Sequence, residues 1–123
     1  MANQIKIEGV ERTINSLKQK GSKADKLVKQ AIEQATLFIH GEVKESIAGR
    51  RNEPTSVDTG RFLNSVQFRI KSPYTGEVSS PVSYAAHLEF GTSRISARKH
   101  FRNTVTRNRK KVVSFVKDKL ANL

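Results

Sequence analysis

The sequence contains no cysteine among its 123 residues, so neither a disulfide framework nor a thiolate metal site can form. It also contains no apolar run near the roughly 20 residues that a helix needs to span a bilayer. The N-terminal stretch MANQIKIEGVERTI has no basic region followed by an apolar core, which predicts that no signal peptide is present. These absences favour a soluble protein that is made in the cytoplasm.

Acidic residues are scarce in the last quarter of the chain. Residues 1–93 contain 13 Lys/Arg and 10 Asp/Glu, whereas residues 94–123 contain 10 Lys/Arg and only Asp118 as an acid. Three quarters of the net charge of +12 therefore lies in that last segment. Such a segment would attract phosphates or an acidic protein face, although a solvated helix face is an equally ordinary explanation.

The spacing of apolar residues predicts a long helix over residues 22–47. Ser22 is a suitable N-cap, and Asp25 stands three residues further on, in the position that completes a capping box. Gly41 lies inside this helix, and we expect it to mark close packing against another element. The apolar face would consist of Val28, Ala31, Ile32, Ala35, Ile39, Val43 and Ile47, with Leu27 and Phe38 beside it.

Two further helices are predicted from the same periodicity. A short amphipathic helix is expected over residues 7–20, and it would end at Gly21. A long C-terminal helix is expected from Ala97 onward, with Ser96 as its N-cap. Its apolar stripe would consist of Phe101, Val105, Val112, Val116 and Leu120, with Asn108 in the middle turn.

Between the two long helices the pattern changes to that of strands. Apolar and polar residues alternate over 65–71, and a turn then leads to a returning antiparallel strand at 77–80. Residues 84–90 fit either a short helix ended by Gly91 or a strand, and Ile95 fits a short edge strand. The order of elements predicts an α+β fold, in which a small antiparallel β-sheet packs with a long helix in the N-terminal half and a long C-terminal helix.

Residues 49–60, GRRNEPTSVDTG, have the composition of a loop, with two glycines, one proline and mostly polar side chains. Such a stretch cannot bury much apolar surface, and it is long for a compact domain. We expect it to be mobile in the free protein and to order against a neighbouring subunit. We also expect a helical turn over residues 61–64, capped by Asp58 or Thr59. The whole chain, residues 1–123, is expected to form a single domain.

The sequence offers no complete catalytic or metal-binding motif. His87-Leu88-Glu89 matches the first half of a zinc-deaminase signature, H-x-E, but the second half needs cysteines that the chain lacks. His40, His87 and His100 show no spacing typical of metal ligands. There is neither a G-x-S-x-G nucleophile turn nor a P-loop pattern. We therefore expect no catalytic residues, no metal and no cofactor, and the sequence favours a protein that is not an enzyme.

Two blocks of sequence, VDTGRFLNSV at residues 57–66 and YAAHLEFGTS at residues 84–93, resemble a family of tailed-bacteriophage neck proteins. These head–tail joining or tail-completion proteins typically contain V-D-T-G-R-L-x-x-S-I, then Y-A-x-x-V-E-F-G-T, and then P-A-x-P-F-L at the start of the last helix. Residues 96–101, SARKHF, occupy the third place and keep the alanine and the phenylalanine but lack proline. The motif residues are Asp58, Thr59, Gly60, Arg61, Tyr84, Glu89, Phe90, Gly91 and Thr92.

The resemblance implies a structural virion protein whose subunits form a ring, six- or twelve-fold, that joins the head to the tail during phage assembly. Its partners would be further copies of the chain, connector proteins on the portal side, and the tail terminator or tail tube, with genomic DNA in the channel as an additional candidate. It would act in the neck or tail of the virion, and in the host cytoplasm during assembly, without a membrane. Two alternatives stay open: a tail terminator or minor tail protein, and a non-specific DNA-binding protein.

Individual motif residues carry structural expectations. Gly60 and Gly91 would occupy backbone positions that need positive φ or close approach, and Glu89 would pair with Arg61 or Arg94. Three residues of the second block would pack into the core: Tyr84, Leu88 and Phe90. The basic residues expected to meet a partner are Arg50, Arg51, Arg94, Arg98, Lys99, Arg102, Arg107, Arg109, Lys110 and Lys111.

Overall fold

The computed structural model describes residues 3–7, 22–56, 60–72 and 74–121. Its elements are β1 (Asn3–Ile7), α2 (Ser22–Ile47), α3 (Arg61–Ser65), β2 (Gln67–Ser72), β3 (Thr75–Ser80), α4 (Ala85–Phe90), α5 (His100–Arg107) and α6 (Arg109–Leu120). The predicted α+β class, with a small antiparallel sheet and long helices, is confirmed. No helix in this described part is both long and apolar enough to cross a membrane.

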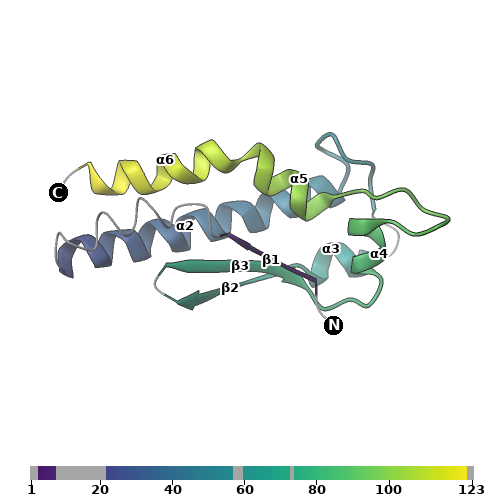
Figure 1. Ribbon diagram of the computed structural model, residues 1–123, viewed down its shortest axis with the longest axis horizontal. Helices are drawn as coiled ribbons and strands as arrows, with labels where there is room; N and C mark the ends of the chain where they lie inside the picture. Colours follow the sequence, from purple (N-terminus) through teal and green to yellow (C-terminus); the bar gives the residue numbers. More distant parts are fainter. Residues whose placement is uncertain (1–2, 8–21, 57–59, 73, 122–123) are drawn as a thin grey trace.

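Helix α2 is the central layer of the molecule. The sheet lies against one side of it, and α5 and α6 lie against the other (Figure 1). The bounds predicted for this helix are confirmed, because α2 extends from Ser22 to Ile47. All seven residues of its predicted apolar stripe are buried, and they form one core with residues of α3, β3, α5 and α6. A stripe this wide allows one helix to pack against two layers.

The sheet has three antiparallel strands in the order β1-β3-β2, and the predicted hairpin β2–β3 is confirmed. The sequence pattern did not indicate β1, which pairs with β3 from Asn3 opposite Ser80 to Ile7 opposite Gly76. A strand of five residues whose partner lies some seventy residues away is too short for its periodicity to stand out. The predicted helix over residues 7–20 is therefore wrong at Ile7, and the rest of it lies outside the described residues.

Strand β3 approaches α2 closely at Gly76. A Cβ on this residue would collide with Oγ1 of Thr36 and would lie 2.9 Å from its Cβ. The Thr36 hydroxyl is held in place, because it donates a hydrogen bond of 2.7 Å to the carbonyl of Ile32. Gly41, in the same helix, has no atom within 4 Å of an added Cβ, so the close packing expected there is wrong.

The predicted C-terminal helix forms, but it begins later than expected and is divided in two. Ser96 is not its N-cap, because α5 begins at His100 after Lys99, whose φ of 55° lies in the left-handed region. A proline cannot adopt this φ, which agrees with the absence of proline from the third block. Asn108 then separates α5 from α6, and its side chain donates a hydrogen bond of 2.9 Å to the carbonyl of Thr104.

The sequence pattern left the structure of residues 84–90 open between a helix and a strand, and it allowed an edge strand at Ile95. Residues 85–90 form the short helix α4, which ends at Gly91. Ile95 does not form an edge strand; it lies in a bend, 41% exposed, and its N–H donates to Oγ1 of Thr92 at 3.1 Å. A local turn therefore satisfies the backbone group that a strand would have used in a ladder.

Gly76 and Gly41 differ in their surroundings and give a matched pair of variants. Gly76→Ala should lower the free energy of unfolding by about 1–3 kcal/mol, because the new methyl group would push α2 and β3 apart. Gly41→Ala should leave the fold intact and raise the free energy of unfolding by up to about 1 kcal/mol, because alanine favours a helix interior. Urea unfolding followed by circular dichroism measures both, and equal effects of the same sign would contradict this packing.

Candidate functional site

The two sequence blocks meet where α3, α4 and α5 converge. Gly60 has a φ of 82° and Gly91 a φ of 78°, so the expectation of positive φ at both glycines is confirmed. A Cβ on Gly91 would also lie 2.8 Å from the backbone nitrogen of Ala97, so this glycine permits close approach as well. The ring of Phe62, in the first block, packs edge-on against Tyr84 of the second, with 6.0 Å between ring centroids. Asp58 and Thr59 lie outside the described residues.

Glu89 fastens the second block to the C-terminal half of the chain. Its carboxylate is only 2% exposed and accepts hydrogen bonds of 2.9 Å from the backbone N–H groups of Phe101 and Arg102. These are donors of the first turn of α5, which have no partner inside the helix. The carboxylate also places negative charge at the positive end of the helix dipole. The predicted pairing of Glu89 with Arg61 or Arg94 is therefore wrong: the carboxylate caps a helix.

A second buried carboxylate, Glu53, ties the 49–56 part of the predicted loop to α5. It accepts hydrogen bonds from Ser46 (2.5 Å), Asn103 (3.2 Å) and both terminal nitrogens of Arg107 (3.0 and 3.1 Å). Burial opposes ionisation, but the bonds from Arg107, Ser46 and Asn103 outweigh it and hold the pKa of the carboxyl below its usual value. The loop is thus tethered at its centre, and its mobility stays a prediction.

His100 lies at the middle of the same network and is fully buried. Its Nδ1 lies 2.8 Å from Oγ of Ser46, and its Nε2 lies 2.6 Å from Oγ of Ser56. Because the Ser46 hydroxyl donates to Glu53, it can only accept from the ring, so Nδ1 carries the proton and Nε2 accepts from Ser56. Burial lowers the pKa of His100 to about 4, although Glu53 opposes this shift.

This chain of serine, histidine and glutamate has the residue types of a hydrolase triad but the surroundings of a structural network. The Ser56 hydroxyl already accepts a 2.9 Å hydrogen bond from Arg98, whose guanidinium also donates to the carbonyl of Thr55 at 2.6 Å. Each hydroxyl and each ring nitrogen therefore has a partner within the protein. The arrangement joins the end of α2, the loop and the start of α5.

The ten basic residues that the sequence suggested for partner binding fall into two groups. Six have partners within the chain. Arg50 and Arg51 pair with Glu45 (3.1 Å) and Glu42 (2.7 Å). Arg98 and Arg107 belong to the buried network, and two others lie over aromatic rings: Arg102 over Phe90 (5.3 Å) and Lys111 over Phe38 (4.9 Å).

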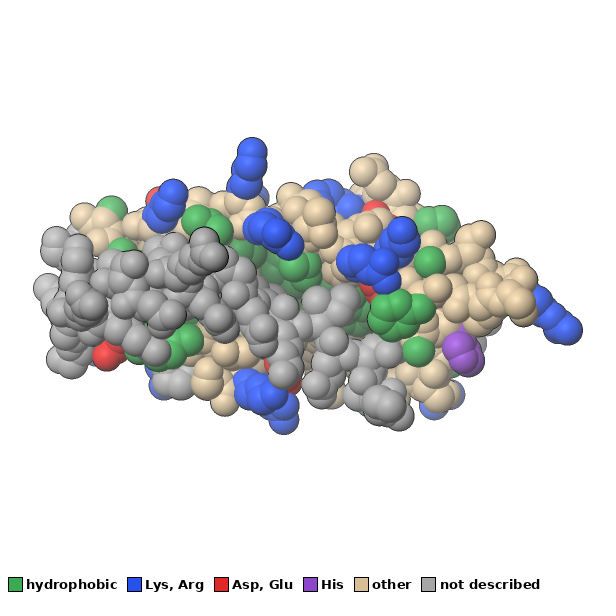
Figure 2. Space-filling view, in the orientation of Figure 1, with side chains coloured by type: hydrophobic (Ala, Val, Ile, Leu, Met, Phe, Trp, Pro, Cys, Tyr) green, Lys and Arg blue, Asp and Glu red, His purple; other side chains and the backbone are tan. Residues whose placement is uncertain are grey.

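The other four basic residues are exposed, and their side chains have no hydrogen-bond or ion-pair partner among the described residues. They are Arg94, Lys99, Arg109 and Lys110. On the face of the molecule shown in Figure 2, Lys and Arg side chains are scattered and do not form one continuous stripe. The freely available positive charge of the last segment is therefore smaller than its composition suggests.

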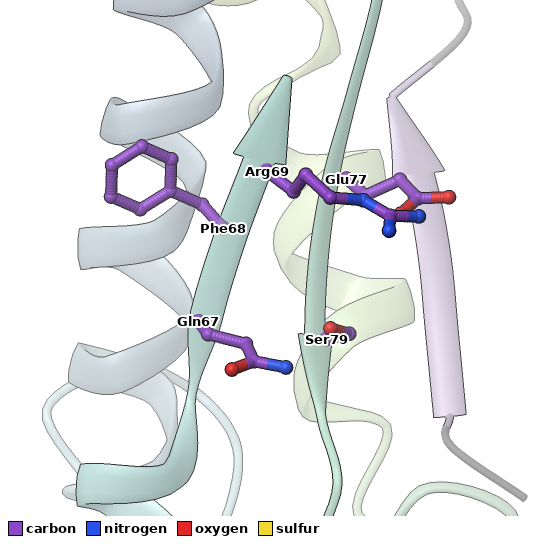
Figure 3. A pocket seen from close by; sticks show the side chains of 5 residues that line it. All are labelled: Gln67, Phe68, Arg69, Glu77 and Ser79. Carbon is purple, nitrogen blue, oxygen red and sulfur yellow. The ribbon is translucent and has the colours of Figure 1, made fainter. Parts of the chain in front are cut away.

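The outer face of the sheet carries a shallow polar cleft of about 230 Å³, lined by Gln67, Phe68, Arg69, Glu77 and Ser79 (Figure 3). Arg69 and Glu77 form an ion pair of 2.7 Å across it. Phe68 points away from this pair, toward α2, where its ring packs edge-on against His40 at 5.2 Å. Within the described ranges, no group of three or more His, Cys, Asp or Glu side chains is arranged to hold a metal ion.

Sequence reasoning missed the residues that build the network: Ser46, Glu53, Ser56, His100 and Asn103. One signal was present, because the polar loop at 49–60 contains an acid, Glu53, in a chain whose last segment is strongly basic. A second correction concerns Phe90, which was expected in the core but is 60% exposed. Tyr84 and Leu88 do pack against the core, as expected.

Removal of the Glu89 carboxylate should destabilise the start of α5. Glu89→Ala leaves two N–H groups without an acceptor near the core, and we expect the free energy of unfolding to fall by about 2–4 kcal/mol. Glu89→Gln keeps one acceptor oxygen and should cost less. Urea unfolding measures the change, with Glu33→Ala on the exposed face of α2 as the control, which should stay within about 0.5 kcal/mol of the parent. A Glu89→Ala variant as stable as this control would contradict the capping role.

Stability should depend on pH through His100. Its folded pKa of about 4 lies below the ordinary 6.5, so the unfolded chain binds a proton that the folded chain excludes between these values. The stabilisation is complete above pH 6.5 and is lost as the pH falls toward 4, with a slope of up to about 1.4 kcal/mol per pH unit. Urea unfolding between pH 7.5 and 4.5 measures this. His87→Gln, at an exposed histidine of α4, should keep the slope, whereas His100→Gln should flatten it; an unchanged slope in His100→Gln would refute the assignment.

The chain was compared with protein-family models, curated proteins and solved structures. A family model described as "Bacteriophage HK97-gp10, putative tail-component" matches residues 8–91, more than half of the chain. The match includes the first sequence block and most of the second, and it ends at Gly91, before α5 and α6. No curated protein and no solved structure matches the chain. The resemblance to phage neck and tail-joining proteins is confirmed at the level of the family: the chain belongs to the HK97-gp10-like family of bacteriophage tail components.

Proposed function

We propose that this protein is a ring-forming structural subunit that joins the head of a tailed phage to its tail during assembly. Membership of a family of phage tail components carries this proposal. The ring, the neck position in the virion, and the portal-side connector, tail terminator or tail tube as partners are parts of the proposal. The host cytoplasm would be the place of assembly.

The arrangement of the described residues supports a function through contact rather than through chemistry. The buried polar groups around Glu53 and His100 hold α2, the 49–56 segment and α5 together, and we propose no catalytic step for them. The exposed basic side chains at the start of α6, Arg109 and Lys110, are not part of this network, because they have no hydrogen-bond or ion-pair partner within the described chain. Surface charges of this kind contribute little to folding but govern encounter with a partner.

A tail terminator, which caps the tail tube before the head docks, is the closest alternative role within assembly. Loss of the protein separates the two roles. A phage without a joining protein yields filled heads and finished tails that stay apart, whereas a phage without a terminator yields tails of irregular length. Electron microscopy of lysates from a deletion phage distinguishes these outcomes, and normal joined particles would contradict both.

Head–tail joining should depend on the position of the unpaired Lys and Arg side chains and not on the net charge of the protein. The double variant Arg109→Glu and Lys110→Glu should fold normally, since both side chains are exposed, and should restore joining poorly when it is added to a lysate of the deletion phage. The control, Lys26→Glu and Lys29→Glu on the exposed face of α2, lowers the net charge of +12 by the same amount and should restore joining as the parent does. The measurement is the yield of infectious particles.

Two results would count against this proposal. Equal loss of joining in both double variants would mean that net charge alone matters. Tight binding of the purified protein to duplex DNA, with a steep fall in affinity as salt is raised, would instead favour a DNA-binding role, because phosphate contacts release counterions.

A further inference from the structure

One end of the molecule carries apolar side chains in an exposed and ordered segment. Residues 91–99 connect α4 to α5 and project beyond the rest of the fold, at the end opposite the C-terminus (Figure 1). Phe90 is 60% exposed and Ile95 41% exposed, which makes them two of the four large apolar side chains that the described chain leaves open to solvent. With Arg94, Lys99 and Arg102 they form what we call the docking tip.

The backbone of the docking tip is held in one conformation. The N–H of Thr92 donates to the carbonyl of Ile95 at 2.8 Å, and the Thr92 hydroxyl accepts from the N–H groups of Arg94 and Ile95, both at 3.1 Å. The N–H of Arg98 donates to the carbonyl of Leu88 at 2.7 Å. At the start of the segment, the backbone of Gly91 lies close to the backbone of Ile95 and Ala97. At its end, the first turn of α5 is held by the hydrogen bonds to Glu89. The apolar residues are thus presented on a rigid support.

The side chains of the docking tip are of the types that dominate protein interfaces. Aromatic residues and arginine are enriched at the centres of such interfaces, and Arg102 lies over the ring of Phe90 with 5.3 Å to its centroid. A surface that is already ordered loses little conformational freedom on binding. We propose that the docking tip binds an acidic face of a different protein, with Phe90 and Ile95 as apolar anchors and Arg94 and Lys99 as charge partners.

A second copy of the chain is a poor partner for the docking tip, because most of its described acidic side chains already have partners within the fold. Of the eight described acids, six have internal partners: Asp25, Glu42, Glu45, Glu53, Glu77 and Glu89. Glu33 and Asp118 remain, and Asp118 stands between Lys117 and Lys119. The described surface of a second copy therefore offers no acidic face for Arg94 and Lys99.

Nucleic acid fits the docking tip less well than protein does. Phosphate recognition needs spaced cations and gains nothing from an exposed aliphatic side chain such as Ile95. The ring of Phe90 is the one base-stacking platform available in the docking tip, and Arg102 already lies over it. An apolar anchor with flanking cations matches an acidic protein surface that has an apolar centre.

This inference deepens the proposed function and names the chemistry of the partner at one surface. The chain has no cysteine, so Ser96→Cys introduces a single thiol at an exposed position next to the proposed anchor Ile95. Benzophenone-maleimide attached there, in protein used to complement a deletion lysate, should on illumination form an adduct with a different virion protein. The adduct should map by mass spectrometry to a peptide rich in Asp and Glu. Gln30→Cys, exposed on α2, is the matched control and should not give this adduct.

Each other product overturns the proposal. An adduct of two copies of this chain would mean that the tip lies at a subunit interface, and an adduct with DNA would mean that it faces the channel. No adduct in joined particles, with the introduced thiol of the Ser96→Cys variant still open to a thiol reagent, would mean that the tip is unused. Ile95→Ser should fold normally and lower the yield of joined particles on the order of tenfold, as loss of an interface anchor does.

The joining assay separates this inference from the proposed function. If deletion of the gene leaves head–tail joining intact, the proposed function fails. If joining requires the protein but proceeds normally with Ile95→Ser and without the predicted adduct, then only the docking tip is wrong.

Discussion

The buried carboxylate of Glu89 is the contact on which the C-terminal half of the structure depends. It satisfies two backbone donors at the start of α5 from outside the helix, at 2.9 Å each and with almost no exposure to solvent. A charge placed so deep is unfavourable unless its oxygens are paired, so the position of α4 relative to α5 is strongly constrained. The segment between these helices can then project from the fold and still be ordered.

Glu53 performs a related task on the other side of α5. It holds Arg107, Asn103 and Ser46, while Ser46 and Ser56 hold the two nitrogens of His100. The two carboxylates therefore fix the same helix against α4 and against the end of α2. Buried polar networks of this kind specify one arrangement, because any other leaves donors or acceptors unpaired. The junction of α2, the 49–56 segment and α5 is therefore held in one arrangement.

Much of the fold could be predicted from the sequence because it follows from local periodicity. The bounds of α2, its buried stripe and the β2–β3 hairpin are each encoded within a short window. Strand β1, the cap from Glu89 and the network around His100 join residues that are far apart in the chain. A single sequence contains no periodic signal for such pairs, so β1 was missed and Glu89 was assigned the wrong partner. Phe90 was placed in the core for the same reason: its apolar character is local, whereas its exposure is set by the fold.

The candidate site shows why charge composition alone is a poor guide to binding. The segment 94–123 has a balance of +9, which suggested a broad basic surface. The fold pairs Arg107 with the buried carboxylate of Glu53 and uses Arg98 to bind oxygens of Thr55 and Ser56. It also sets Arg102 and Lys111 over aromatic rings. A cation that is engaged within the fold contributes less to an encounter with a partner than one that is free. The proposed docking tip therefore relies on a few free cations together with exposed apolar side chains, whose positions the two buried carboxylates fix.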